Sequence, residues 1–285
     1  MTQSKVFKFR SRQLVSKDIP LIMGIVNATP DSFSDGNLYF DIEKGFQHAK
    51  EMIENNVDII DIGGESTRPG AKEVGVDDEI MRVVPLIERI KDYFPESVVS
   101  VDTRKSAVAR KALEVGADII NDVSGTEFSE DMIDLAVEFD AGLMIMHMRG
   151  QPKNMQSKHN TKYHNIIDEV RSYLFGQAKK AINAGLNARN IVIDPGIGFA
   201  KTFEQNIKLI KNAPRFVESD FTVLYGTSRK RFIGEVLSVD DPQKRVFGTI
   251  GSSAALAESG VEIIRVHDAI EHKQFFKVYQ MCQKF

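Results

Sequence analysis

Eight short apolar runs, each rich in Val and Ile, recur along the chain and alternate with segments of helical spacing. This alternation is typical of repeated βα units, whose strands pair in parallel. We expect strands at residues 21–27, 58–65, 98–103, 119–125, 142–148, 191–198, 222–227 and 263–268. Eight such units in 285 residues predict an α/β fold of the TIM (β/α)8 barrel type.

Amphipathic segments between the runs are expected to be helices, and several end at Gly or Asn, as helices commonly do. They include residues 45–56, 77–94, 107–116, 131–140 and 166–185. An open doubly wound sheet is the alternative fold. It would need a glycine-rich dinucleotide turn after the first strand, and GIVNATPD at 24–31 contains none.

The segment before the first barrel strand, residues 6–18, alternates weakly between apolar and polar residues. We interpret it as a short hairpin or strand that covers the N-terminal mouth of the barrel. No linker or low-complexity tract interrupts the βα period, so residues 1–285 are expected to form a single domain.

Charge and cysteine content narrow the classes of partner. A net charge of -3 argues against nucleic acid, although a local basic pocket could still bind a small anion. The single cysteine, Cys282, excludes a disulfide within the chain and indicates a reducing, cytoplasmic setting. No apolar run approaches the roughly 18 residues of a membrane span, so we expect a soluble protein with no membrane partner.

Polar side chains follow every predicted strand at its C-terminal end. Any one of them could be an ordinary strand end, but their recurrence at all eight strands predicts a pocket, because these ends meet at the mouth where barrel enzymes keep their active sites. The residues are Asn27, Glu65 with Thr67 and Arg68, Asp102, Asn121 with Asp122, His147, Asp194, Ser228 to Lys230, and Arg265 with His267.

The chemistry of these side chains suits a ligand with a flat heterocyclic head. Asp102, Asn121 and Asp194 offer carboxylate and amide groups that match adjacent N–H donors, such as those of an amino-pyrimidinone. Lys230 can meet the carbonyl group of the same ring.

A second group of side chains suits a phosphate tail. Arg265, His267 and Arg68 supply cationic donors. Asn27 is followed by a segment rich in hydroxyls and carboxylates, residues 29–35, and beside a diphosphate such hard oxygen donors indicate Mg²⁺ rather than zinc.

Seven segments in register, between about residues 22 and 270, resemble the dihydropteroate synthase family. They are NATPDSFSDG, DIGGESTRPGA, SVDTRKSAVARKALEVGADIINDVSG, MHMRGQPKNMQ, IDPGIGFAKTFEQN, GTSRKRFIG and RVHD. The resemblance implies a TIM barrel, usually a homodimer, that works in folate biosynthesis with Mg²⁺. Such an enzyme joins (7,8-dihydropterin-6-yl)methyl diphosphate to 4-aminobenzoate and releases diphosphate.

The resemblance also implies how the substrates are held. Asp194 would bind the 2-amino and N3–H edge of the pterin, and Lys230 its carbonyl side. Its remaining nitrogens would face Asn121 and Asp102. The diphosphate would be held by Asn27, Arg68, Arg265 and His267, and Asn27 would also bind Mg²⁺.

Two loops would close over the pterin by the same resemblance and form the 4-aminobenzoate pocket. The pocket residues would be Phe33, Thr67, Pro69, Phe199 and Ser228. The catalytic residues would be Asp35, Arg68, Asp102 and Lys230. Arg231 departs from the Ser that some members carry, which leaves the contacts to the aminobenzoate carboxylate open.

Three other functions remain as alternatives at this point. A pterin-dependent methyltransferase of the same fold would share the residues at the pterin edge. A Schiff-base aldolase would use Lys230, and a binding or structural subunit would have no activity. We interpret His147 as a packed histidine, and His159 and His164 predict no zinc site.

Overall fold

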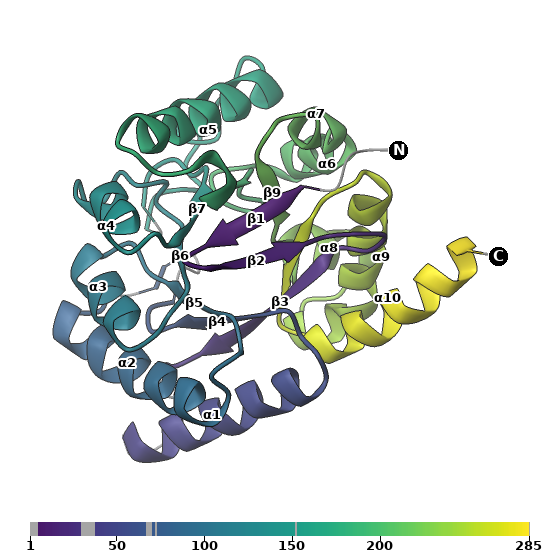
Figure 1. Cartoon of the computed structure of the whole chain (residues 1–285). Helices are drawn as coiled ribbons and strands as arrows, with labels where there is room; N and C mark the ends of the chain where they lie inside the picture. Colours follow the sequence, from purple (N-terminus) through teal and green to yellow (C-terminus); the bar gives the residue numbers. More distant parts are fainter. Residues whose placement is uncertain (1–4, 30–37, 67–69, 72, 152, 285) are drawn as a thin grey trace.

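The computed structural model describes residues 5–29, 38–66, 70–71, 73–151 and 153–284. Eight parallel strands close into a barrel in the order β10-β3-β4-β5-β6-β7-β8-β9, and β9 pairs with β10 (Figure 1). The predicted TIM barrel is therefore confirmed. The strands are β3 (Leu21–Asn27), β4 (Ile59–Gly63), β5 (Val99–Asp102), β6 (Ile119–Asp122), β7 (Gly142–Met146), β8 (Ile191–Asp194), β9 (Thr222–Tyr225) and β10 (Ile263–Val266).

Helices surround the barrel (Figure 1). They are α1 (Leu38–Glu54), α2 (Val76–Tyr93), α3 (Ser106–Glu114), α4 (Met132–Glu138), α5 (Ile166–Asn183), α6 (Phe203–Lys211), α7 (Pro214–Val217), α8 (Arg231–Leu237), α9 (Val246–Glu258) and α10 (Ala269–Lys284), with short 3-10 turns η1 (Ala188–Asn190) and η2 (Pro242–Arg245). None of the described helices has the length and apolar character needed to cross a membrane.

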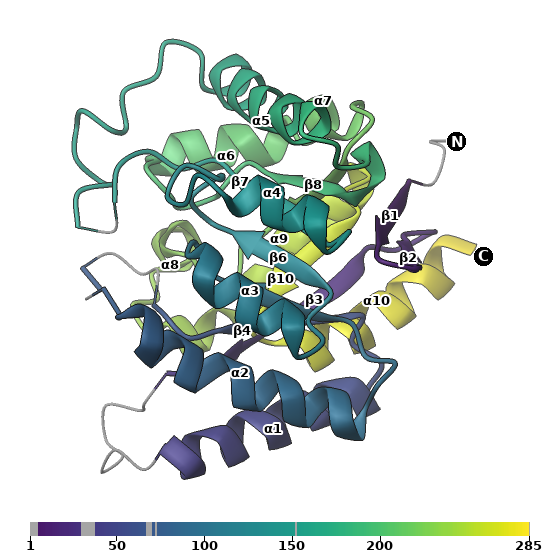
Figure 2. The same ribbon diagram turned by 60° about the vertical axis from the view of Figure 1, so that its left-hand side comes forward.

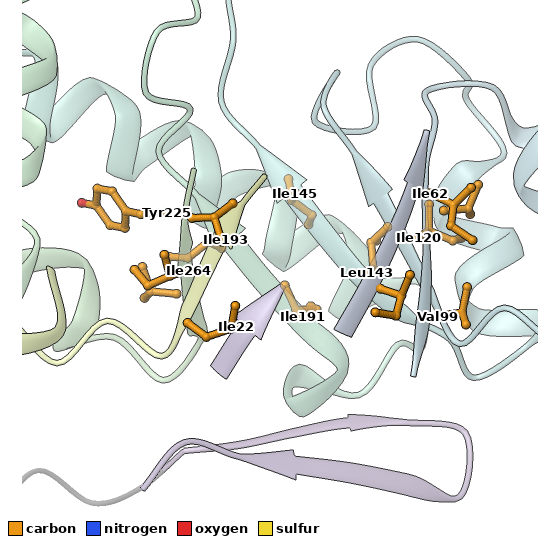
Figure 3. Packing of buried hydrophobic residues seen from close by; sticks show 14 of the residues in the cluster. Ile22, Ile62, Val99, Ile120, Leu143, Ile145, Ile191, Ile193, Tyr225 and Ile264 are labelled. Atoms are coloured by element: carbon orange, nitrogen blue, oxygen red, sulfur yellow. The ribbon is translucent and has the colours of Figure 1, made fainter. Parts of the chain in front are cut away.

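Alternation along each strand separates two apolar layers. On β8, Ile191 and Ile193 face outward and pack under the helices (Figure 3). Val192 alternates with them and belongs to the inner cluster with Phe7 and Phe9. Asp194 follows Val192 by two residues and therefore shares its inward side. The barrel strands thus present mainly apolar side chains to the helices, and inward polar side chains such as Asp61, Asp102, Asn121 and Asp194 lie in their middle and C-terminal parts.

Residues 6–15 form the predicted hairpin. Strands β1 (Val6–Phe9) and β2 (Arg12–Val15) pair in antiparallel fashion. Phe7 and Phe9 are buried against the inward residues at the N-terminal ends of the barrel strands. Gly142 permits this approach, since a Cβ there would lie 2.7 Å from Cζ of Phe7. Figure 2 shows the hairpin on the side opposite the long segment that leads into α5, so the hairpin covers the N-terminal end of the barrel and leaves its C-terminal mouth uncovered.

Most strands end earlier than the sequence predicts. The strand expected at 191–198 ends at Asp194, because Gly196 has a φ of 70° and turns the chain out of the sheet. Asn27, Asp102, Asn121, Asp194 and Arg265 still lie within the strands near their C-terminal ends, whereas Glu65, His147 and His267 lie on the loops that leave them.

Candidate active site

Asn27, Asp102 and Asn121 lie at the same height along the barrel axis, at the C-terminal mouth. Strand register places Asn27 beside Gly63, Gly63 beside Asp102, and Asp102 beside Asn121. Asp194 ends β8 on the far side of the barrel axis. Residues that are distant in the sequence are thus brought to one end of the barrel by closure of the sheet.

Arg265 lies between two buried carboxylates. Its Nε donates to Oδ2 of Asp61 at 2.7 Å, and its terminal NH2 lies 2.6 Å from Oδ2 of Asp102. Asn121 Nδ2 also donates to Asp61 Oδ2, at 3.2 Å. Burial alone would lower the pKa of Arg265, but Asp61 and Asp102 raise it above its usual range. The guanidinium is therefore a fixed positive charge at the centre of the mouth.

Asp61 is a residue of the site that was not predicted from the sequence. It is fully buried, and its Oδ1 has no hydrogen-bond partner among the described residues. The signal was its position: it lies two residues before Gly63, on the inward side of an otherwise apolar strand. An inward carboxylate needs a cationic partner, and only the closed barrel brings Arg265 from β10 to it.

Burial raises the pKa values of two of the carboxylates towards neutral pH. It raises the pKa of Asp102 to about 7, against the opposing effect of Arg265. It raises the pKa of Asp194 to about 6, opposed by the Gly196 N–H and by Lys230. Both groups can therefore act as carboxylates above neutral pH and can hold a proton in mildly acidic solution.

The loop after β8 folds back over the end of β7. Asp194 Oδ1 accepts a hydrogen bond of 2.7 Å from the Gly196 N–H. A Cβ on Gly196 would lie only 2.1 Å from the carbonyl oxygen of His147, so no other residue fits this turn. The close approach holds the Asp194 side chain in one orientation.

Lys230 and Phe199 come together from neighbouring loops. Lys230 Nζ lies 4.2 Å from the centroid of the Phe199 ring, a cation–π distance. Lys230 immediately precedes α8, and its charge acts on Asp194. An aromatic face, an ammonium group and a carboxylate thus adjoin one another.

Ser228 and His267 are joined directly. Ser228 Oγ lies 2.9 Å from Nδ1 of His267 and accepts a hydrogen bond of 3.1 Å from the His267 backbone N–H. The next residues strengthen this link, since Arg229 Nε donates to Asp268 Oδ2 at 3.0 Å. The loops after β9 and β10 are therefore held together at the site.

Asn27 is the described residue that fits the expected metal. It ends β3 with an exposed side chain. Within the described ranges, no group of three or more His, Cys, Asp or Glu could hold a metal ion. Mg²⁺ commonly takes one or two protein oxygens and completes its shell with substrate phosphate oxygens and water. The donor at this position therefore suits a magnesium ion that is held mainly by a diphosphate.

A cavity of about 500 Å³ adjoins this group of residues. Asp102, His147 and Phe199 form part of its wall, and the remainder comes mainly from the loops after β4 to β7. Arg104 stacks over Phe128 at 4.1 Å on the same wall. The cavity provides both apolar and charged surface next to the polar residues at the barrel mouth.

The structure places the predicted ligand-binding residues that it describes at the C-terminal mouth: Asn27, Asp102, Asn121, Asp194, Phe199, Ser228, Lys230, Arg265 and His267. Glu65 instead pairs with Arg104 and Lys105. Asp122 lies on the outward side of β6, where it accepts hydrogen bonds from the N–H groups of Ser124 and Thr126. The other predicted site residues, Phe33, Asp35, Thr67, Arg68 and Pro69, lie outside the described residues. His147 is buried and packs edge-on against Tyr173, in agreement with its interpretation as a packed histidine.

Known proteins resemble the chain over nearly its whole length. The profile of the family described as pterin binding enzymes matches residues 23–267. The dihydropteroate synthase of Synechocystis is 41% identical over 257 residues, which are 90% of this chain and 88% of that protein. The dihydropteroate synthase of Bacillus subtilis is 41% identical over 279 residues, 98% of this chain and 93% of that protein.

Solved structures agree with this similarity. Xanthomonas albilineans dihydropteroate synthase with 4-aminobenzoic acid superimposes with a TM-score of 0.90 at 37% identity, over 99% of this chain and 100% of that one. The same enzyme in complex with 7,8-dihydropteroate gives a TM-score of 0.85 at 32% identity, over 99% of this chain and 100% of that one.

Proposed function

The chain belongs to the dihydropteroate synthase family of pterin-binding enzymes, and from this premise we propose how its barrel mouth carries out the family reaction. It is a transferase that condenses (7,8-dihydropterin-6-yl)methyl diphosphate with 4-aminobenzoate to give 7,8-dihydropteroate and diphosphate. The assignment of roles rests on one observation: Asp102, Asn121 and Asp194 are buried at the C-terminal mouth, and Arg265 contacts Asp102 there.

The pterin head group is assigned to the buried carboxylates. An ionised Asp194 accepts hydrogen bonds from the 2-amino group and N3–H of the pterin, and Asn121 and Asp102 face its other nitrogens. A buried carboxylate with two such donors makes strong, directional contacts. Lys230, which the Phe199 ring holds beside Asp194, meets the ring carbonyl.

The diphosphate is assigned to the cationic side of the mouth. Arg265 and His267 supply donors from β10 and the loop after it, together with Asn27 and Arg68. Mg²⁺ held by Asn27 and the diphosphate would neutralise charge on the leaving group. Arg265 already pairs with Asp61 and Asp102, so its guanidinium is oriented before any anion arrives.

The bond to the leaving group breaks before the new bond forms in this proposal. The electron-rich dihydropterin can delocalise the positive charge left on the methylene carbon, and Asp102, with Asp35, stabilises that cation. The aniline nitrogen of 4-aminobenzoate is already nucleophilic, so it requires no strong general base. Its ring is assigned to Phe33, Thr67, Pro69, Phe199 and Ser228.

One assay tests the function. The protein is incubated with the pterin diphosphate, Mg²⁺ and 4-aminobenzoate, and dihydropteroate and diphosphate are measured. We expect the two products in equal amounts. A pterin-dependent methyltransferase would instead release no diphosphate and would pass a methyl group to a corrinoid protein, so methyl transfer without condensation would reject the proposal.

Arg68→Ala is expected to lower turnover more than it lowers pterin affinity. Removal of one preorganised donor to developing charge typically costs about 2.7–4 kcal/mol, or on the order of 10²–10³ in kcat. Steady-state kinetics and pterin calorimetry on the same preparation separate the two effects. Parallel losses in kcat and in pterin affinity would show that Arg68 serves ground-state binding.

We further propose that the chain forms a homodimer through α8 and α9. Phe247 is 86% exposed on α9, and Val236 is 63% exposed on α8. Gly251 and Ala255 are exposed on the same side of α9 as Phe247. Because both have small side chains, the Phe247 ring protrudes above the surface next to it. Large exposed apolar side chains of this kind often mark protein interfaces.

Phe247→Asp is expected to convert the dimer to a monomer, because the new charge would be buried without a partner. Size-exclusion chromatography with light scattering measures the mass. Met81→Asp, at an exposed apolar position on α2, is the matched control and should remain dimeric. A dimer that survives Phe247→Asp would place the interface elsewhere.

A cytoplasmic location is part of the same proposal. Cys282 is an exposed, free thiol, the form that a reducing compartment preserves. The pathway of folate synthesis, which the resemblance implies, also uses small soluble substrates.

A further inference from the structure

Lys201 is a buried lysine that the proposed reaction does not use. It immediately precedes Thr202, the N-cap residue of α6, and is only 3% exposed. A buried ammonium group is unfavourable unless its hydrogen bonds are satisfied. Its position next to the loop that carries Asp194 and Phe199 therefore requires an explanation.

Three acceptors surround the three hydrogens of the Lys201 ammonium group. Nζ lies 2.8 Å from the carbonyl oxygen of Phe199, 3.1 Å from Nδ1 of His147 and 3.2 Å from the His147 carbonyl oxygen. Burial, together with the charge of Lys201, lowers the pKa of His147 to about 2. The imidazole is therefore neutral, and its Nδ1 can accept the bond.

These contacts fasten the loop after β8 to the end of β7. The backbone N–H of His147 also donates to the Asp194 carbonyl oxygen at 2.9 Å. The ends of β7 and β8 are therefore joined both by this backbone bond and by the Lys201 side chain. Phe199, whose carbonyl Lys201 binds, presents its ring to Lys230. Asn206 and Gln156 also bind this loop, at Gly198, but Lys201 is the charged side chain that joins it to the end of β7.

Lys201 also acts on the charge of Asp194. Three cations act on this carboxylate: Lys230 immediately before α8, Lys201 before α6, and Arg265 on β10. Tyr225 on β9 points outward and donates to the Leu209 carbonyl oxygen; burial, with the charge of Asp194, raises its pKa. The proposed function assigns Lys230 to the pterin carbonyl and Arg265 to the diphosphate, so both are engaged by substrate. The three hydrogen bonds of Lys201 go to protein acceptors, so its charge still lowers the pKa of Asp194 when the substrate is bound.

The reverse effect is also present. Burial lowers the pKa of Lys201 to about 7, and Asp194 is the charge that opposes this most, against Lys230 and Arg149. The lysine is therefore charged in the range below pH 7, where Asp194 loses its proton.

We propose that Lys201 is a positioning residue for the pterin, whose buried ammonium group fixes residues 194–200 and keeps the Asp194 carboxylate ionised for the head group. This inference rests on the proposed function, because it takes Asp194 as the pterin ligand. It adds a role for a residue that touches neither substrate.

The test is the pH profile of pterin affinity. Binding of 6-hydroxymethyl-7,8-dihydropterin is measured by calorimetry from pH 5.5 to 8.5 for the wild type and for Lys201→Met. Without the lysine charge, the midpoint of the profile should move up by about one pH unit. The ratio of dissociation constants should then approach tenfold near pH 5.5 and fall toward its constant, structural value by pH 8.5.

Lys208→Met, on the exposed side of α6, is the matched control and should keep the wild-type profile. Lys201→Gln should show the same displacement as Lys201→Met, because the two share only the lost charge. A ratio that is the same at every pH would overturn the proposal and leave Lys201 a purely structural clamp. A wild type that binds no pterin would instead reject the proposed function.

A reciprocal measurement decides the matter if neither Lys201 variant folds. In Asp194→Asn, the pKa of Lys201, followed by ¹⁵N NMR of its Nζ, must fall below its wild-type value, since coupling between two charges acts equally on both. An unchanged Lys201 titration would overturn the proposal.

Discussion

Asp194→Ala will abolish calorimetric binding of the pterin head group. The substitution removes the carboxylate that we assign to two adjacent N–H donors, at a position that is only 8% exposed. Loss of one partner from a buried, charged hydrogen-bonded pair typically costs 2–5 kcal/mol or more, so affinity should fall on the order of 10³-fold. The measurement is titration with 6-hydroxymethyl-7,8-dihydropterin at pH 7.5, where Asp194, with a pKa of about 6, is ionised.

Two further variants test whether the loss of affinity is specific to the Asp194 carboxylate. Asp134→Ala removes an exposed carboxylate from α4 and should bind like the wild type. Asp194→Asn keeps the side-chain shape without the charge and should also lose most of its affinity, because an amide offers one acceptor where the head group needs two. Equal affinity of Asp194→Ala and the wild type would refute the head-group assignment.

Arg265→Met is expected to destabilise the fold by about 3–5 kcal/mol at pH 8, since it leaves Asp61 and Asp102 buried without their common cation. The loss should be smaller at pH 5.5. Asp102 already has a raised pKa, and removal of Arg265 raises it further. The folded state then binds a proton that the unfolded state releases, so stability increases as the pH falls from 8 toward 5.

Urea unfolding at the two pH values measures this difference. Arg231→Met removes an exposed arginine that pairs with Glu235 on α8 and should change stability by less than about 1 kcal/mol. Adding Asp61→Asn to Arg265→Met should recover part of the loss, since one buried charge is removed with its partner. A loss below about 1 kcal/mol, or one equal at both pH values, would mean that Arg265 does not neutralise these carboxylates.

Much of the site could be predicted because each residue carries a local signal. Asp102, Asn121 and Asp194 end Val- and Ile-rich runs, where a polar side chain is costly unless it has a function. Asp61 and Lys201 do not end such a run. Asp61 is a carboxylate inside an apolar strand, and its partner Arg265 is 204 residues away. Lys201 reads as an ordinary lysine at a helix start, and only the fold of the β8 loop buries it.

The sequence by itself determined the order of strands and helices, the apolar faces that pack them, and the polar residue at each strand end, because these depend on periodicity along the chain. Pairing of the last strand, β10, with the first barrel strand, β3, closes the sheet, and this closure decided the rest. It brought Arg265 to Asp61 and Asp102, buried them together, and thereby raised the pKa of Asp102. Charge, burial and distance depend on neighbours in space, and those neighbours are set only when the barrel closes.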